Sequence, residues 1–504
     1  MEIGELKILF KYIADTRHSY LSPVEVYLAD KKNPKLLQLY KCILNGKVKN
    51  HSEAAEFILG KSASDKEYNS LKNQLMERIS VLALEIDPEK ALKAMASRHI
   101  FRSYRYLFAG MFLYRIPATI ILADEFLNKS VVKGDFINDP LVTMLSSFWK
   151  SDLNALKNQP EEFYENKKQF NISLKRFADE SKLRLYESEL NLIQSGSHMT
   201  QYRFVSKAKK YYLEAKKIHE QYQSYHTYLT YAIIGIRYGF FSKNYDLVIE
   251  MANLRDELFI KHPQYVSYYL TSMTSTYRMI AYMYLRKYEE GKQEARVMIS
   301  KMKTGNRDWL AILEYYFLLC MHSGNYEQAL NVYYDVFKSV YYQSLNPEYQ
   351  ERWKYFEPYL NFIIPDQFPK ESINLLGFLD EMSYYTSHKG DNNIIIMVGQ
   401  IIVMMDMDEF EKLAERTTYL ESYIKKYVEK KIYPRTWIFL NMMLKLFKNN
   451  FNAKKTSMQV DKQFQMLTPF EGNPLYCIDG IEVIPYDTLW QDIIKKLFKK
   501  QSRA

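Results

Sequence analysis

The sequence predicts an all-α chain built from helical hairpins that stack in a row, and three observations lead to this prediction. Glycine and proline are scarce, at 16 and 15 of 504 residues, whereas tyrosine and phenylalanine are abundant, at 44 and 28. Few helix breakers and many large apolar residues favour long, packed helices. Residues 307–337 form two amphipathic segments joined by a turn, and from residue 245 onward an aromatic residue recurs at regular intervals.

The segment 307–337 is the clearest predicted hairpin. Apolar residues in its first half recur at i, i+3, i+4 and i+7, which marks one face of a helix; they are Leu313, Tyr316, Phe317 and Cys320. Gly324 can take the left-handed conformation that a helix end requires. The small Ala329 lets the returning helix approach closely. One hairpin cannot bury both of its faces, so it implies neighbouring hairpins in a stacked array.

The run G-x-Y-x-x-A-x-x-x-Y-x-x-V that starts at Gly324 resembles a tetratricopeptide repeat (TPR). That family has a small residue where Phe317 stands, so we expect looser or more splayed packing here. An aromatic anchor is expected to open the second helix of each pair; the anchors are Tyr245, Tyr288, Tyr326, Phe410 and Phe451. They are about 38–43 residues apart, with one double step, a spacing nearer to that of HEAT-like arrays. The prediction is therefore a TPR-like/HEAT-like α-solenoid over residues 90–467.

Residues 1–89 are predicted to form a separate three-helix module. Asn33 and Pro34 open the first helix and Gly46 ends it. A short helix over 52–59 stops at Gly60, and Ser64 with Glu67 gives a capping-box signature for a long third helix. Three helices with a tight turn before the third are what a helix-turn-helix needs.

The sequence of this module allows two ligand-binding interpretations. Residues 55–62 fit a relaxed nucleotide-binding loop, but a phosphate cradle needs a glycine-rich loop after a strand, and here Gly60 caps a helix. The second interpretation is DNA binding by four basic residues around the third helix: Lys61, Lys66, Lys72 and Arg78. Acidic residues alternate with them, and such a mixed face is usually only solvated. A docking module is therefore favoured, with DNA binding as the alternative.

Residues 468–504 differ in composition from the rest. The stretch 468–487 holds three prolines and two glycines, and an amphipathic helix follows over 488–500. This suits the polar-faced cap that the end of a repeat array needs. The run I-P-Y-D-T-L-W at 484–490 resembles the ending of an uncharacterised bacterial family of helical-repeat proteins. That resemblance transfers no catalytic residue to this chain.

The bulk composition bounds the class of protein. The formal charge of +10 is a mild excess for this length, which permits an acidic partner without requiring one. Three distant cysteines and no secretory signal indicate reduced thiols in a cytoplasmic protein. The apolar run 394–405 lies between Asp391 and Asp406 and is too short to span a membrane, so it predicts a buried helix.

No catalytic, cofactor-binding or metal-binding motif is present, and the histidines are scattered singly. We therefore expect a non-enzymatic scaffold that binds a protein or peptide. Tyrosine doublets along the array are good interface material, and the prediction places three rings exposed in a groove: Tyr269, Tyr277 and Tyr315. The partner should be a neutral or acidic peptide. The alternative function is a DNA-binding regulator whose solenoid acts as the sensor.

Overall fold

The computed structural model describes residues 2–16, 24–29, 34–83, 85–92, 95–135, 138–194, 198–265, 268–302, 307–344, 347–367, 392–470, 473–479 and 481–502. Within these ranges the protein is all-helical and has no β-strand. The chain divides into two compact units. Unit 1 holds Met1–Asp179 and His262–Ser267, and unit 2 holds Glu180–Lys261 and Tyr268–Ala504. The boundaries expected at residues 89 and 467 stay predictions.

Unit 1 begins with a small helical cluster with its own core: α1 (Ile3–Thr16), α2 (Val24–Leu28), α3 (Pro34–Leu44), α4 (His51–Leu59) and α5 (Lys66–Ala83). The three predicted helices correspond to α3, α4 and α5, and α1 packs against α3 and α5. The rings of Phe10 and Tyr40 lie 5.0 Å apart at the centre. The cluster therefore contains two helices that the punctuation of residues 34–84 did not predict.

The helix ends of this cluster follow the local sequence signals. α3 begins at Pro34, and Gly60 ends α4 in the left-handed conformation, with its N–H donating to the carbonyl of Glu56. The expected capping box is wrong, because Asp65 caps α5 and accepts from the N–H of Glu67 at 2.7 Å. A carboxylate at this position also faces the positive end of the helix dipole. Asn33 lies outside the described residues.

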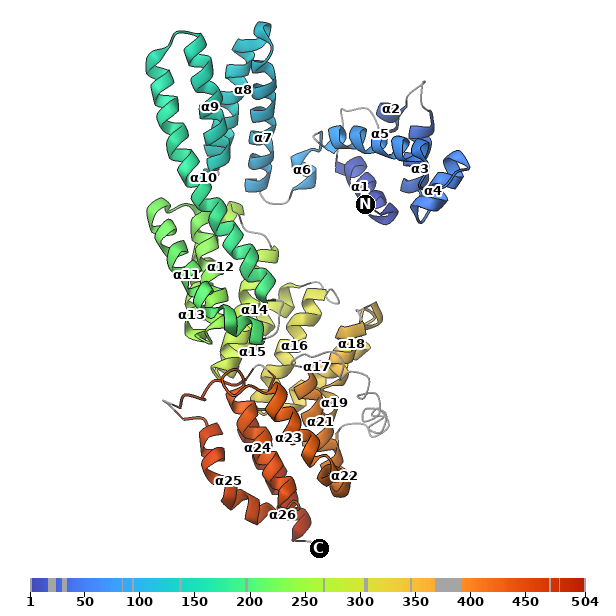
Figure 1. Cartoon of the computed structure of the whole chain (residues 1–504), viewed down its shortest axis with the longest axis vertical. Helices are drawn as coiled ribbons and strands as arrows, with labels where there is room; N and C mark the ends of the chain where they lie inside the picture. The colour runs from blue at the N-terminus through green and yellow to red at the C-terminus, as the bar shows by residue number, and fades with distance from the viewer. Residues whose placement is uncertain are drawn as a thin grey trace. The chain divides into compact units, whose positions relative to one another are not determined.

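The rest of unit 1 consists of longer helices: α6 (Pro88–Ala91), α7 (Met95–Tyr114), η1 (Pro117–Thr119), α8 (Ile120–Asp135), α9 (Pro140–Leu156), the first part of α10 (Pro160–Gln194) and η2 (Pro263–Tyr265). α7, α8 and α9 lie side by side (Figure 1). Gly110 permits the close approach of α7 and α8, since a Cβ there would lie 2.8 Å from Cγ of Leu127. Pro117 opens η1, which leads into α8.

Unit 2 begins with the second part of α10 and continues as helices that each pack on the next: α11 (His198–Tyr222), α12 (Tyr225–Phe241), α13 (Tyr245–Lys261), α14 (Tyr268–Tyr284), α15 (Tyr288–Lys301), α16 (Arg307–His322) and α17 (Tyr326–Lys338) (Figure 1). The aromatic anchors Tyr245, Tyr288 and Tyr326 are the first residues of α13, α15 and α17. The prediction that an aromatic residue opens these helices is confirmed.

The same tight turn precedes several of these helices. One residue at each turn has a positive φ, namely Lys243 (57°), Arg286 (57°), Gly324 (73°) and Asp408 (62°). In each turn the next residue donates its N–H to the carbonyl five positions back, as from Asn325 to Cys320 at 2.9 Å. This is the hydrogen bond that a left-handed helix end makes. The sequence reveals it only at Gly324, because the other positions are not glycine.

The remaining helices of unit 2 are η3 (Tyr342–Ser344), α18 (Pro347–Lys354), α19 (Glu357–Ile363), α21 (Asn392–Asp406), α22 (Phe410–Glu415), α23 (Thr417–Tyr427), α24 (Pro434–Lys448), α25 (Ala453–Leu467) and α26 (Tyr486–Gln501). The apolar run in α21 is buried in the main core, as predicted. No helix among the described residues is both long and apolar enough to cross a membrane. Asp391, the expected cap of α21, lies outside them.

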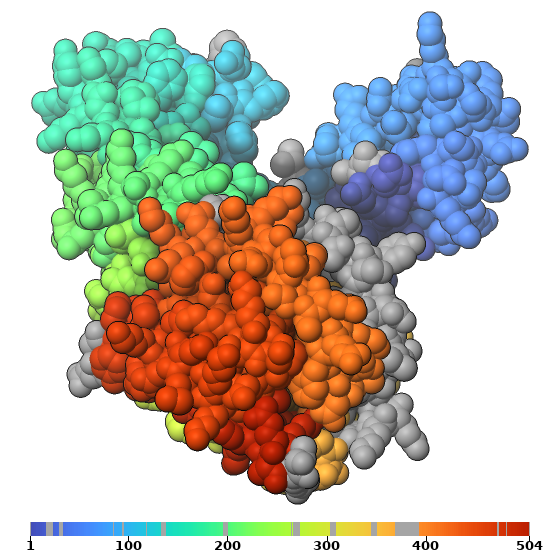
Figure 2. Space-filling view, turned by 60° about the horizontal axis from the view of Figure 1, so that its bottom comes forward, coloured from blue at the N-terminus to red at the C-terminus, as the bar shows by residue number. Residues whose placement is uncertain are grey.

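One large core joins α14–α26. Phe317 is fully buried there, with its ring 4.7 Å from that of Phe356 and 5.7 Å from that of Trp353. The looser packing expected at Phe317 is therefore wrong, because α18 and the residue before α19 supply rings that enclose it, whereas the alternative of a more splayed hairpin stays a prediction. Tyr486 of α26 stacks on Phe439 of α24 at 4.3 Å. Figure 2 shows the C-terminal helices, in orange and red, as one continuous packed surface.

Candidate functional site

A cavity of about 340 Å³ lies within unit 2 and draws its walls from distant parts of the sequence. The end of α10, the start of α11, the α12–α13 turn, α14, α16, the approach to α24 and the segment before α26 all contribute. Tyrosines are prominent in its lining: Tyr202, Tyr245, Tyr284, Tyr315 and Tyr433. We refer to this cavity as the tyrosine pocket.

The tyrosines of the pocket differ in how much of the side chain is exposed, from Tyr202 at the rim to the buried Tyr245. Tyr202 is 45 % exposed, whereas Tyr245 is 5 % exposed and meets the ring of Tyr284 edge-on at 4.6 Å. Burial raises the pKa of Tyr245, so its hydroxyl stays protonated and can donate a hydrogen bond. Rings of this kind offer a large contact area together with a hydroxyl. The pocket therefore presents both apolar faces and hydrogen-bonding groups.

Lys243, in the turn between α12 and α13, forms part of the polar wall. Its Nζ donates to the carbonyl of Ile432 at 2.7 Å and lies 3.5 Å from Oδ1 of Asp479. Gly239 lets this turn fold tightly, because a Cβ there would lie 2.7 Å from Cγ2 of Val248. The turn thus brings Lys243 to both the approach to α24 and the segment before α26.

Behind Asp479 lies a buried polar network centred on Arg435, the second residue of α24. Arg435 is fully buried, and its guanidinium makes five hydrogen bonds: to both carboxylate oxygens of Glu482, to Asp487, and to the carbonyls of Leu467 and Leu475. Burial opposes its charge, but Glu482 and Asp487 hold the pKa of Arg435 above its usual value. All five N–H groups of the guanidinium are therefore satisfied.

The network continues to other helix ends. Arg286 donates to both oxygens of Asp487, at 2.8 and 3.3 Å, and to the carbonyl of Tyr476. Nε2 of His322 lies 2.6 Å from the carbonyl of Glu482, so its neutral form carries the proton on Nε2. Asp479 accepts from the backbone and hydroxyl of Thr436, each at 2.9 Å. The three acidic residues Asp479, Glu482 and Asp487 thus bind the helix ends that surround them.

Of the three predicted partner-binding tyrosines, the structure describes the side chains of two, and only one of these lines the pocket. Tyr315 is half-buried and lines the tyrosine pocket. Tyr277 is 7 % exposed, with its ring 5.5 Å from Phe240 and 5.1 Å from the guanidinium carbon of Arg237. The exposure expected for Tyr277 is therefore wrong, because α12 covers it. Tyr269 belongs to α14, but its side chain lies outside the described residues.

The four basic residues of the predicted DNA-binding helix do not form an uninterrupted positive face. Lys61 precedes α5 and lies 2.7 Å from Glu67, which also pairs with Lys35 at 2.9 Å. These cations hold the pKa of Glu67 near 2. Lys66 is exposed, whereas Lys72 and Arg78 are half-buried. Acidic residues therefore alternate with basic ones in space as they do in sequence.

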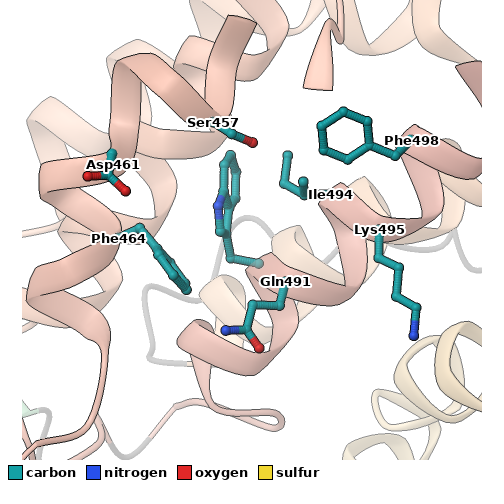
Figure 3. Close-up of a pocket in the computed structure, with 8 residues that line it drawn as sticks. Ser457, Asp461, Phe464, Gln491, Ile494, Lys495 and Phe498 are labelled. Carbon is teal, nitrogen blue, oxygen red and sulfur yellow. The ribbon is translucent and has the colours of Figure 1, made fainter. Parts of the chain in front are cut away.

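A second cavity, of about 390 Å³, lies between α25 and α26. Figure 3 shows Asp461 and Phe464 projecting from one wall, with Ile494 and Phe498 on the other. Phe498 is 44 % exposed, so the groove reaches the surface. Most of the surface that lines this cavity is apolar.

Within the described ranges, no group of three or more His, Cys, Asp or Glu side chains is placed to hold a metal ion. The residues that sequence analysis missed are Lys243, Arg435, Asp479, Glu482 and Asp487. A signal for the acidic ones exists, because they interrupt an otherwise apolar stretch at 477–490. Acidic residues among buried neighbours require cationic partners.

Compared with known protein families, with curated proteins and with solved structures, the chain shows no match.

Proposed function

We propose that the protein is a non-enzymatic scaffold, a TPR-like α-solenoid that binds a protein or peptide partner in the tyrosine pocket. The observation that supports this most is the convergence of five tyrosines on one cavity within unit 2. Tyrosine is enriched at protein interfaces because one rigid side chain supplies both apolar contact and a hydroxyl. The volume of about 340 Å³ falls in the range of ligand pockets and suits a short peptide segment.

The recurring architecture supports the solenoid part of the proposal. Neighbouring helices in sequence are neighbours in space from α11 to α17, and the same left-handed turn recurs among the helix pairs. A repeat array grows in this way, since each hairpin buries its faces against the next. Gly291 of α15 shows how tightly the elements fit, because a Cβ there would lie 2.7 Å from Leu319 of α16.

The charge around the pocket favours a neutral or acidic peptide. Two lysines line the pocket, Lys243 and the exposed Lys431. The one acidic residue in the lining, Asp479, is 2 % exposed and already accepts a hydrogen bond from Thr436. A peptide entering the pocket therefore meets lysine before it meets a carboxylate. Raised salt should weaken such binding moderately, because the rim charges are screened.

Photo-crosslinking in the native host tests this proposal. A benzoylphenylalanine replaces Tyr202 at the pocket rim, and a second variant carries it at Tyr419 of α23, a residue of comparable exposure (55 % against 45 %). We expect a discrete adduct from position 202 and none of the same mass from position 419. The double variant Tyr202→Ala/Tyr315→Ala should reduce affinity for the captured partner by about 30-fold, as hot-spot residues do. Equal adducts from both positions would contradict the proposal.

A DNA-binding regulator is the second candidate function, because α3, α4 and α5 form a compact cluster with a tight turn at Gly60. The ion pairs of Glu67 with Lys35 and Lys61 argue against DNA binding, because those lysines already have an acidic partner. Fluorescence anisotropy with mixed duplex DNA decides between the two functions. Micromolar affinity that falls steeply with salt, and that the variant Lys61→Glu/Lys66→Glu loses, would favour the regulator.

A further inference from the structure

The groove between α25 and α26 exposes apolar side chains of two helices at once. Most of its lining residues recur at i, i+4 and i+7 on α25 and at i, i+3, i+4 and i+7 on α26, so each set marks one helix face. They are Ser457, Asp461 and Phe464 of α25, and Gln491, Ile494, Lys495 and Phe498 of α26 (Figure 3). The volume of about 390 Å³ between these faces leaves room for side chains of a partner.

The apolar arc of α26 is wider than the main core covers. Leu489, Ile493 and Leu497 are at most 3 % exposed in that core. Ile494 and Phe498 extend the arc into the groove, where Ile494 is half-buried and Phe498 is exposed. A helix that packs only on its own core needs one apolar stripe. The wider arc therefore indicates that a second apolar surface packs against α26.

One end of the groove is basic. The two helices run antiparallel, and the N–H of Ala453 at the start of α25 donates to Oε1 of Gln501 at the end of α26, at 3.3 Å. Lys454 and Lys499 therefore lie toward the same end, and Lys495 lines the groove one turn before Lys499. All three lysines are exposed. An anionic group at this end of the groove would meet several cations.

The carboxylates of the two helices do not balance their lysines. The lysines at 496 and 500 pair with the acidic residues at 406 and 408. The other five are exposed and form no ion pair with a described residue: Lys454, Lys455, Lys462, Lys495 and Lys499. Of the three carboxylates, Asp487 is bound by Arg286 and Arg435, which leaves Asp461 and Asp492. Five lysines against two carboxylates leave an excess of three positive charges.

We infer that the groove between α25 and α26 binds an acidic amphipathic helix of another protein. A hollow between two packed helices accepts the apolar face of a third helix, whose large side chains enter between Phe464 and Phe498. Acidic residues beside that face meet the excess positive charge and fix the register of the bound helix. A second copy of this chain fits less well, because its own lysines would be brought against these. A membrane surface also fits less well, because the apolar side chains of the groove line a hollow and do not protrude.

Fluorescence anisotropy with labelled synthetic peptides and the full chain tests this inference. Four acidic helices carry Leu, Ile, Phe or Met at i, i+3, i+4 and i+7 with glutamate elsewhere, and four matched helices carry lysine in place of glutamate. We expect at least one acidic helix to bind about tenfold or more tightly than its basic counterpart, with an affinity that falls as salt is raised. Saturable binding by none of the acidic helices, or equal binding by the acidic and basic sets, would overturn the inference.

Variants of the groove locate the bound peptide. Phe498→Ser removes one apolar wall and should weaken binding of the acidic helix by about tenfold or more. Lys495→Glu/Lys499→Glu should weaken it too and should reverse the preference between acidic and basic helices. The control is Met466→Ser, because Met466 of α25 has a similar exposure, 46 %, but does not line the groove. Circular dichroism should show the helix content of the parent in all three variants. Parent affinity in Phe498→Ser would overturn the inference.

Three further measurements distinguish other occupants. Tyr202→Ala/Tyr315→Ala should bind the acidic helix like the parent, and a loss of binding would place the peptide in the tyrosine pocket instead. A dimer of the parent that Phe498→Ser dissociates, measured by analytical ultracentrifugation, would show that a second copy occupies the groove. Vesicles of phosphatidylserine and phosphatidylcholine that bind the parent but not Phe498→Ser would show a membrane surface. Each of these three results would overturn the inference.

Discussion

The two turn residues Lys243 and Arg286 show why the sequence of this chain hides its turns. Both have φ of 57°, a conformation that side chains other than glycine adopt at a cost of about 1–2 kcal/mol. Glycine would remove that cost, but it would also remove the side chains that bind Asp479 and Asp487. The polar contacts of Lys243 and Arg286 therefore explain why these positions are not glycine, as Gly324 is.

Arg435→Met is expected to be strongly destabilising. The variant leaves Glu482 and Asp487 buried with one cationic partner fewer, and breaking a buried ion pair typically costs about 3–5 kcal/mol. Four of the five tryptophans lie in unit 2, so fluorescence during urea unfolding reports mainly on this unit. The exposed Arg416→Met should stay within about 0.5 kcal/mol of the parent. Similar effects of the two substitutions would mean that the network contributes little.

His322 should make the stability of unit 2 fall on mild acidification. Burial lowers its pKa to about 4, whereas an unfolded histidine titrates near 6.5. Between these values the unfolded state binds a proton that the folded state does not, so stability decreases as pH falls. From pH 7 to 5 the loss attributable to His322 is about 2 kcal/mol.

The variant His322→Gln isolates this contribution. Its side-chain amide can still donate to the carbonyl of Glu482, but it does not titrate. Urea unfolding of parent and variant at pH 7 and pH 5 should show a smaller loss for the variant. If both lose the same free energy, His322 is not responsible for the pH dependence.

At the scale of elements, helix starts were predictable and helix surroundings were not. Tyr245, Tyr288, Tyr326 and Phe410 each open a helix because an aromatic after a tight turn repeats with the hairpin. The surroundings of Phe317 were predicted wrongly, because the rings that enclose it, Trp353 and Phe356, lie over thirty residues later in the chain. Local patterns encode where an element begins, whereas its partners depend on which distant element packs there.

Ala329→Trp tests the packing of α17. Ala329 is fully buried in the main core and occupies the position where the two helices of the hairpin are expected to approach most closely. Inserting a large ring into a packed site typically costs about 1–3 kcal/mol. The melting temperature should therefore fall. The matched substitution Asn331→Trp, at an exposed position of the same helix, should leave it nearly unchanged. Equal melting temperatures for the two variants would show that α17 is packed differently.

At the scale of the whole molecule, the tyrosine pocket could not be predicted because its walls range from Gln194 to Asp479. Only Tyr315 was anticipated, through the doublets, and Tyr277 from the same reasoning is buried. Periodicity identifies the faces of a helix, but it does not show which face a later segment will cover. The acidic residues at positions 479, 482 and 487 indicated buried ion pairs, but the sequence did not show which cationic residues would be their partners.

The segment 473–487 contacts helix ends that are far apart in the sequence. Asp479 meets Lys243 at the α12–α13 turn, and Asp487 meets Arg286 at the α14–α15 turn. Glu482 meets His322 at the end of α16 through its carbonyl, and meets Arg435 at the start of α24 through its carboxylate. A terminal cap of a repeat array would touch only the last pair of helices. The segment instead ties together several successive pairs of unit 2.

Truncation after Leu467 distinguishes a cap from such a tie. If residues 468–504 only cap the array, hydrogen exchange should accelerate in α24 and α25 and little elsewhere. If they tie the helix pairs together, α12–α17 should also lose protection, because Lys243, Arg286 and His322 lose their partners and unfolding units of this kind are cooperative. We expect the second pattern when the full chain and the truncated chain are compared by hydrogen–deuterium exchange. The triple variant Asp479→Asn/Glu482→Gln/Asp487→Asn retains the residues of α26 and should show the same loss of protection in α12–α17, in weaker form. If truncation removes protection only from α24 and α25, the segment is a cap and not a tie.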